Sequence, residues 1–457
     1  MNRQSFVPET EIRGMFSDAM SGMYRREVPQ YGLLLDIVRE TNAQFLAAHP
    51  QEADQLPRHG EMDRIDLERH GAVRLGTPAE LAMMRRALAV MGLRPVSYYD
   101  LSVAGVPVHA TAFRPVDPAS LDQNPFRIFC SLLRLELIED VALREQAKAL
   151  LAGRKIYSDK AIALVEQYEH DGGLDAASAK SFVAAILETF RWHADALVDQ
   201  GTYVKLHDAH RLIADVVCFK GPHINHLTPR SLDIDAAQSA MLARGLDAKA
   251  VIEGPPHRRV AILLRQTSFK ALEEKVRFPG DQADAQGTHT ARFGEIEQRG
   301  MALTRKGRAL YDELLAEVRG EEGSQAGDYQ ARLERAFQRF PDDLDTIRRQ
   351  GLGHFHYRLV GSIAAYGSRP FDLEALVEVG VVQAVPMLYE DFLPVSAAGI
   401  FQSNLGGTEQ KVYSAQEQQA AFEDALGAKI ADPFALYESI ERQSIDAIRA
   451  VYALARS

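Results

Sequence analysis

Residues 288–300 read THTARFGEIEQRG and place two carboxylates, Glu295 and Glu297, two residues apart. In an extended strand, alternate side chains point to the same face, so these carboxylates would lie side by side. Like charges in that position repel each other unless a positive group lies close to them. A metal ion is one such group, and pairing with Arg292 and Arg299 is the alternative. Gly294 removes a side chain next to Glu295, which suits close approach by another backbone or a ligand.

A second segment, RHGAVR at residues 69–74, offers an imidazole and a guanidinium. His70 and Arg74 are four residues apart, so in a strand both side chains point to one face. A metal ligand and a fixed cation on one wall would suit the two ends of a dicarboxylate. The alternative is a structural histidine beside a surface arginine.

A third segment, GPHINH at residues 221–226, lies between Pro222 and Pro229 and is expected to be short and irregular. In an extended chain His223 and His226 point to opposite faces, so one is expected to bind a metal and the other to be structural. The residues alone do not choose between them. Two imidazoles and one carboxylate from three distant segments match the ligand set of non-haem iron oxygenases, which leaves one face of the iron open.

Two other histidine pairs compete for a metal. His207 and His210 have helical i, i+3 spacing, whereas His354 and His356 alternate as they would in a strand. A solvated helix face is the alternative for the first pair. Spacing alone does not exclude either pair as a ligand set.

A fourth segment, YEDFLPVSAAGIFQSNLG at residues 389–406, is rich in small residues after Pro394. Small side chains permit a ligand to approach the backbone closely, and Ser396 adds a hydroxyl group. The alternative is a buried turn that is packed by small side chains.

The composition is that of an ordinary globular protein. The 457 residues are 46% hydrophobic and 25% charged, and the net charge of −11 gives no support for nucleic-acid binding. No window approaches the ~18 consecutive apolar residues that cross a bilayer. The first residues, MNRQSFVPETEIRG, lack the apolar stretch of a signal peptide. Cys130 and Cys218 lie in apolar strings and are expected to be reduced core thiols, which predicts a cytoplasmic protein. The oligomeric state does not follow from the sequence.

Helical and extended signals alternate along the chain and predict one integrated α+β body over residues 1–457. Thr77-Pro78-Ala79-Glu80 carries the signals of a helix start, so an extended segment at 64–75 should lead directly into a helix. Helices are expected at 31–48, 298–318, 328–349, 415–428 and 433–454, and extended segments at 211–219, 259–266 and 375–404. The metal-site sheet is expected to use residues of about 60–115, 205–300 and 375–405, with a helical insertion at about 126–198 and a helical C-terminal region at about 410–457.

At these motifs the chain resembles the 2-oxoadipate dioxygenase/decarboxylases, which are the bacterial 2-hydroxyglutarate synthases. The resemblance extends from near residue 6 to the C-terminal helices. The strings that carry it are RHGAVRLGT from residue 69, VVCFKGPHINHLTPR from 216, LLRQTSFKAL from 263, HTARFGEIEQRG from 289 and YEDFLPVSAAGIFQSNLG from 389.

The resemblance implies a fold of the vicinal oxygen chelate type, in which a curved, partly closed β-sheet cups a metal and helices elaborate it. It implies Fe(II) held by His70, His226 and Glu295, and thereby selects His226 over His223. It also implies that Arg74 binds the distal carboxylate of the substrate and that Val395 and Ser396 line the substrate pocket. The implied reaction converts 2-oxoadipate and O2 to 2-hydroxyglutarate and CO2, in lysine catabolism.

Two other functions would use the same three ligands. One is a zinc-dependent hydrolase or lyase, and the other is a non-catalytic protein that binds a 2-oxo acid. Oxygen consumption with iron separates the first from an oxygenase, and turnover separates the second.

Overall fold

The computed structural model describes residues 5–51, 62–249, 251–280, 286–319, 326–366, 370–393 and 410–455. Contacts divide the chain into two compact units. Unit 1 comprises Met1–Lys249, Gln266–Glu297 and Pro394–Ile430, and unit 2 comprises Ala250–Arg265, Gln298–Leu393 and Ala431–Ser457. Each unit is built from three separate stretches of the chain. A single catalytic domain over residues 1–457 stays a prediction.

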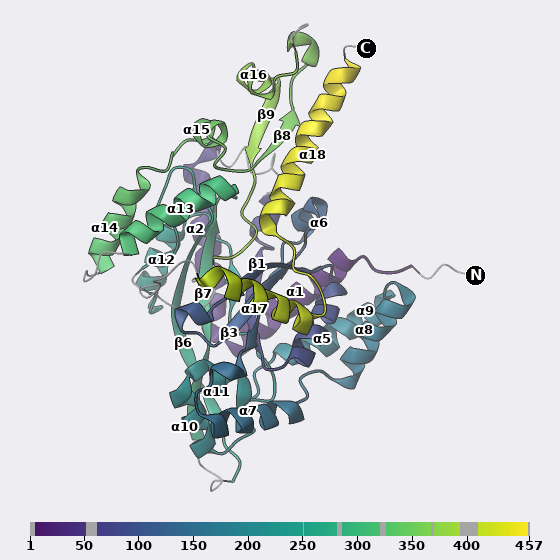
Figure 1. The fold of residues 1–457 in the computed structure, drawn as a ribbon, viewed down its shortest axis with the longest axis vertical. Helices are drawn as coiled ribbons and strands as arrows, with labels where there is room; N and C mark the ends of the chain where they lie inside the picture. The colour runs from purple at the N-terminus through teal and green to yellow at the C-terminus, as the bar shows by residue number, and fades with distance from the viewer. Residues whose placement is uncertain are drawn as a thin grey trace. The chain divides into compact units, whose positions relative to one another are not determined.

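Unit 1 combines helices with the strands that carry the predicted site residues (Figure 1). Its strands are β1 Arg69–Leu75, β2 Arg94–Asp100, β3 Val108–Arg114, β4 Arg127–Leu133 and β5 Leu227–Pro229, together with most of β6 Leu264–Arg277 and β7 Gln286–Arg299. Its helices are α1 Glu9–Glu27, α2 Pro29–Ala48, α4 Met62–Ile65, α5 Pro78–Ala89, α6 Pro118–Gln123, α7 Val141–Gly153, α8 Asp159–Asp171, α9 Ala176–Leu187, α10 Gln200–Ala209, α11 Arg211–Val217, α12 Ile234–Ala243 and α17 Gln410–Leu426.

The larger sheet of unit 1 has the strand order β2-β3-β4-β1-β5. After β1 the chain forms α5 and then β2, β3 and β4. β3 pairs antiparallel with both β2 and β4, and β4 lies parallel to β1. His70 is paired with Arg127 of β4 on one side of β1 and with Thr228 of β5 on the other. The sheet thus brings residues 70 and 228 onto neighbouring strands although they are far apart in sequence.

The predicted helix start at Thr77 is confirmed. The Thr77 hydroxyl accepts a hydrogen bond from the backbone N–H of Glu80, and the Glu80 carboxylate accepts one from the backbone N–H of Thr77. Glu80 also pairs with Arg154, which ties the first turn of α5 to the end of α7. The apolar side chains Leu81, Met84 and Leu88 are fully buried, as their helical spacing predicts.

A second, two-stranded sheet of β6 and β7 carries the acidic segment. Gly294 is required there, because a Cβ at this position would lie 1.8 Å from the ring of Phe269 on β6. The sequence predicted close approach by a backbone or a ligand, whereas the close neighbour is an aromatic ring.

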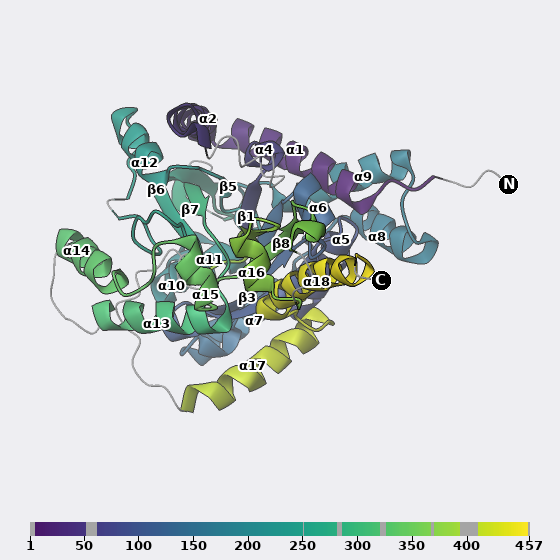
Figure 2. The ribbon, with the colours of Figure 1, turned by 90° about the horizontal axis from the view of Figure 1, so that it is seen from above.

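Helices cover the strands of unit 1. α1 and α9 lie side by side (Figure 2), and α17 packs against α5. Among the described residues, none of the helices has the length and the apolar run that crossing a lipid bilayer requires.

Unit 2 contains α13 Arg305–Arg319, α14 Ala326–Phe337, α15 Leu344–Arg349, β8 Phe355–Leu359, α16 Leu373–Glu378, β9 Val382–Pro386 and α18 Pro433–Leu454. β8 and β9 form an antiparallel pair. The long helix α18 runs beside β8 (Figure 1). His354 is part of this packing, because its Nδ1 lies 2.9 Å from a carboxylate oxygen of Glu441 on α18.

The mixed α+β class predicted from the sequence is confirmed, and the sheets are open. The two C-terminal helices are also confirmed, as is the helix predicted at 31–48. Both cysteines are free and buried.

Four predicted segments are wrong in part. Residues 127–133 open the predicted helical insertion but form β4, and residues 211–217 were expected to be extended but form α11. Both segments, RIFCSLL and RLIADVV, are mainly apolar, and they lack the regular alternation that separates a buried strand from a buried helix. The helix predicted at 328–349 is broken near Pro341, because proline cannot continue a helix. Within the part of 375–405 that the structure describes, β9 pairs with β8 and not with the sheet that carries His70.

Candidate metal site

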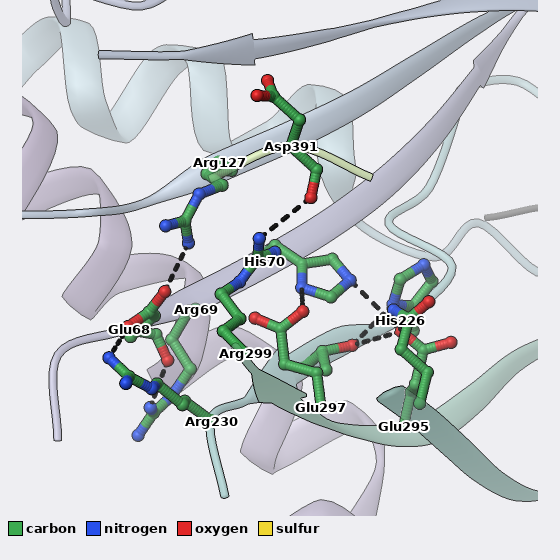
Figure 3. A network of polar contacts seen from close by, with 12 residues as sticks. Glu68, Arg69, His70, Arg127, His226, Arg230, Glu295, Glu297, Arg299 and Asp391 are labelled. Carbon is green, nitrogen blue, oxygen red and sulfur yellow. Dashed lines mark hydrogen bonds and ion pairs between the residues drawn. The ribbon is translucent and has the colours of Figure 1, made fainter. Parts of the chain in front are cut away.

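Three buried side chains from distant segments converge in unit 1 (Figure 3). His70 comes from β1, His226 from the residue before β5, and Glu295 from β7. One ligand atom of each residue lies within 4.8 Å of the ligand atoms of the other two. Among the described residues, these three form a group of His, Cys, Asp or Glu side chains that could hold a metal ion. The structure therefore brings together the three residues that the resemblance implies as metal ligands.

The backbone explains why these segments meet. The segment at Asn225 lies between β1 and β7, since its N–H donates to the carbonyl of Ala72 and its carbonyl accepts from the N–H of Phe293. Gly71 permits this packing. A Cβ on Gly71 would lie 2.6 Å from a side-chain carbon of Ile224 and 3.0 Å from the carbonyl oxygen of His226.

One oxygen of Glu295 lies at the centre of the cluster. Its Oε1 is 3.1 Å from Nε2 of His70 and 3.5 Å from Nδ1 of His226. The same oxygen accepts hydrogen bonds from the hydroxyl of Thr228 and the amide of Gln266. Burial by itself would raise the pKa of Glu295, but the neighbouring His226, His70 and Thr228 lower it below its ordinary value. Glu295 is thus an ionised carboxylate, as a metal ligand must be.

His70 lies between two carboxylates. Its Nε2 faces Glu295, and its Nδ1 lies 3.0 Å from Oε2 of Glu297 (Figure 3). Burial by itself lowers the pKa of His70, but Glu297 and Glu295 outweigh it, so that the pKa lies above the ordinary histidine value. Glu297 therefore orients His70 from the side that faces away from Glu295. A carboxylate behind a metal-binding histidine fixes its ring and raises its basicity.

His226 has the opposite electrostatic environment. The pKa of His226 is lowered to about 4, mainly by burial. The charge of Glu295 raises this pKa, whereas the charges of His70 and Arg74 lower it further. Its ring stacks on Phe293 at 4.8 Å between centroids, and its Nδ1 lies 2.8 Å from the hydroxyl of Thr228. His226 is consequently neutral at physiological pH, which is the form that binds metals.

A buried ion-pair network holds the strands beside the site. Glu68, directly before β1, pairs with Arg127 of β4 at 2.7 Å and with Arg230 at 3.1 Å. Arg230 forms a parallel bridge with Glu297 on β7. Figure 3 shows Glu68 between the two guanidinium groups. Because all three side chains are almost completely buried, breaking one pair would leave an uncompensated charge.

The donor set and its spacing fit a divalent metal ion. Ligands at right angles around a metal, with bonds of about 2.1 Å, lie about 3 Å apart. The 3.1 Å contact of Glu295 Oε1 with Nε2 of His70 is close to that spacing. Two histidines and one carboxylate on one face are the ligands of non-haem Fe(II) oxygenases.

Arg74 lies on β1, as predicted, and pairs with a residue that the sequence did not indicate. Its Nη1 is 2.7 Å from Oδ2 of Asp215 on α11. Arg74 is close enough to His226 to lower the pKa of that imidazole. The pairing leaves Arg74 partly exposed, with 24% of its side chain accessible to solvent.

The remaining candidates lie elsewhere. His207 is exposed on α10, and His210 caps α11 by accepting from the N–H of Leu212. His354 and His356 belong to unit 2. Val395 and Ser396 lie outside the described residues, so their predicted place in the substrate pocket stays a prediction.

The proposed arginine partners of the acidic pair also lie elsewhere. Arg292 pairs with Glu27 and Glu274. Arg299 donates to the carbonyl oxygens of Tyr389 and Asp391.

Several site residues were missed from the sequence. Thr228 and Gln266 bind Glu295, while His289 lies at Asp215. They are single polar residues without a spacing relation to one another, so no local pattern pointed to them.

The comparisons with known proteins identify a family. The family model for 2-oxoadipate dioxygenase/decarboxylase matches residues 16–404. The proteins named 2-oxoadipate dioxygenase/decarboxylase from Pseudomonas putida and Escherichia coli are each 55% identical, over 98% and 96% of this chain and 98% of each relative. The crystal structure of the hydroxyglutarate synthase in complex with 2-oxoadipate from Pseudomonas putida matches with a TM-score of 0.91 at 55% identity, over 97% of this chain and 98% of that one.

Metal binding should release a proton from His70. A proton and a metal ion compete for the same imidazole, and the pKa of His70 is raised. The affinity for Co(II) should therefore fall as the pH is lowered through that pKa, which lies above the ordinary histidine value. Calorimetry in buffers of different ionisation enthalpy measures the released protons. The exposed His207→Gln variant is the control and should match the wild type, whereas a pH-independent affinity would show that His70 is not a ligand.

Glu297 should support metal binding without touching the metal. Glu297→Gln keeps the shape but removes the charge behind His70, so Co(II) affinity should fall by about 10- to 100-fold. The d–d absorption of Co(II) reports occupancy, and circular dichroism reports folding. Glu273→Gln, at an exposed position on β6, is the matched control. An unchanged affinity in a folded Glu297→Gln variant would contradict the supporting role.

Proposed function

The chain belongs to the 2-oxoadipate dioxygenase/decarboxylase family, and we propose that it uses dioxygen to convert 2-oxoadipate to 2-hydroxyglutarate and CO2. The observation that carries the proposal is the convergence of His70, His226 and Glu295. The relative from Pseudomonas putida, crystallised with 2-oxoadipate, supports the choice of substrate.

We assign Fe(II) to the three ligands. Two imidazoles and one carboxylate are the donor set that would hold ferrous iron. Ferrous iron would supply the reaction with dioxygen. The protein supplies the rest: Glu297 and Thr228 hold the ligands in place, and burial keeps water away.

Arg74 is assigned to the distal carboxylate of 2-oxoadipate. A guanidinium holds a carboxylate through two parallel hydrogen bonds, and hydrogen bonds to charged groups contribute about 1.5–3 kcal/mol. The 2-oxo acid end would bind at the metal and the distal carboxylate at Arg74. The distance between these two sites would then select the chain length of the substrate. Arg74 therefore selects a dicarboxylate over a 2-oxo acid with an apolar tail.

The remaining assignments extend this proposal. The unit β1–α5–β2–β3–β4, with His70 on its first strand, supports a relation to the vicinal oxygen chelate fold with a curved, partly closed sheet around the metal. The two free buried cysteines support a reducing, cytoplasmic compartment. Lysine catabolism, and a pocket lined by Val395 and Ser396, rest on the family resemblance.

The direct test is anaerobic loading with Fe(II) or Zn(II), followed by 2-oxoadipate and then oxygen. The iron-loaded protein should consume one O2 and release one CO2 for each 2-hydroxyglutarate formed, and the zinc-loaded protein should be inactive. Glu295→Gln should lose both metal and activity. Product from the zinc-loaded protein without oxygen uptake would favour the hydrolase or lyase, and binding without turnover would favour a 2-oxo acid-binding protein.

A further inference from the structure

A second buried polar cluster in unit 1 is centred on Asp215 of α11. Oδ1 of Asp215 lies 3.2 Å from Nε2 of His223 and 2.9 Å from Nε2 of His289, while Oδ2 lies 2.7 Å from Nη1 of Arg74. Although burial by itself would raise the pKa of Asp215, His223 and Arg74 hold it well below its usual range. None of these contacts involves the three proposed metal ligands.

The two histidines are themselves fixed in place. Nδ1 of His289 lies 2.8 Å from the hydroxyl of Tyr203 on α10. The ring of Trp192 stacks on His289 and meets the edge of His223 at 4.8 Å between centroids. Both imidazoles are almost completely buried. Asp215 is therefore held at one oxygen and presents the other to Arg74.

Arg74 uses only part of its guanidinium in this contact. Its Nη1 binds Asp215, whereas its Nη2 and Nε have no partner among the residues that the structure describes. A carboxylate binds a guanidinium through two parallel N–H groups, and Nη2 and Nε form such a pair. The long side chain of an unpaired arginine would have to be ordered when substrate binds, at a cost in affinity.

We propose that Asp215, held by His223 and His289, is a positioning residue that fixes Arg74 in the orientation in which it receives the distal carboxylate of the substrate. The inference rests on the proposed function, because it takes Arg74 as the group that binds this carboxylate. It explains why GPHINH contains two histidines: His226 lies at the metal site and His223 at Asp215.

The alternative is that Asp215 competes with the substrate for Arg74. A competitor would have to leave Arg74 when the substrate arrives. Asp215 is instead tied to two imidazoles and is 6% exposed. The two roles predict opposite effects of removing the charge.

The experiment compares Asp215→Asn, Arg74→Ala and the double variant. Each iron-loaded protein is assayed with 2-oxoadipate and with 2-oxohexanoate, which has the same chain length without the distal carboxylate. Anaerobic calorimetry gives Kd for both acids independently of turnover. Asp215→Asn should raise Kd and KM for 2-oxoadipate by about tenfold, with a smaller change in kcat and smaller changes for 2-oxohexanoate. In the Arg74→Ala background it should have no further effect on 2-oxoadipate.

Two further variants control for folding. Asp195→Asn breaks an exposed aspartate–arginine pair with Arg277, and it should leave Kd and KM for both acids unchanged. Tyr203→Phe removes the hydroxyl behind His289 and should raise Kd for 2-oxoadipate in the same direction as Asp215→Asn, by about twofold to threefold. Thermal unfolding and Co(II) affinity confirm that each variant retains the fold and the metal site.

The outcomes separate the inference from the proposed function. A lower Kd for 2-oxoadipate in Asp215→Asn would overturn positioning in favour of competition, and equal losses on both acids would assign Asp215 a structural role only. Full additivity with Arg74→Ala would also overturn it. If Arg74→Ala affects both acids equally, the carboxylate-binding role of Arg74 fails, and the inference fails with it.

Discussion

Two glutamates buried on one face of β7 are the constraint on which the site depends. Ionised carboxylates inside a protein are unfavourable unless donors or positive charges surround them. Glu295 meets this requirement with His70, His226, Thr228 and Gln266, and Glu297 meets it in part with His70. The segment around Asn225 connects β1 to β7 through backbone hydrogen bonds, which puts the donors within reach. The metal site is thus a consequence of how three segments share their backbone contacts.

The two proposed histidine ligands differ in their electrostatics. His70, between two carboxylates, has a raised pKa, whereas His226, against Phe293 and near Arg74, has a lowered one. A metal ion would replace the proton on the first and use the neutral form of the second. The buried carboxylate of Asp215 is likewise surrounded by nitrogen groups, namely two imidazoles and one guanidinium.

Much of the site was predictable because its chemistry is local. The pair Glu295 and Glu297 and the helix start at Thr77 follow from strand alternation and capping, and both predictions agree with the structure. The choice of His226 over His223 did not follow from spacing and came from the family resemblance. Asp215 was missed because it lies in RLIADVV, an apolar run interpreted as a strand, in which a single aspartate has no visible partner. β4 was missed for the same physical reason, since a run that is buried on all sides carries no period.

The proposed chemistry requires one metal ion bound by His70, His226 and Glu295. The most direct measurement is anomalous diffraction at the iron edge from crystals grown anaerobically with Fe(II) and 2-oxoadipate. We expect one strong peak about 2.0–2.3 Å from a nitrogen of each histidine and an oxygen of Glu295, with the 2-oxo acid bound beside it. A peak at any other group of side chains, or iron bound without one of these three residues, would contradict it.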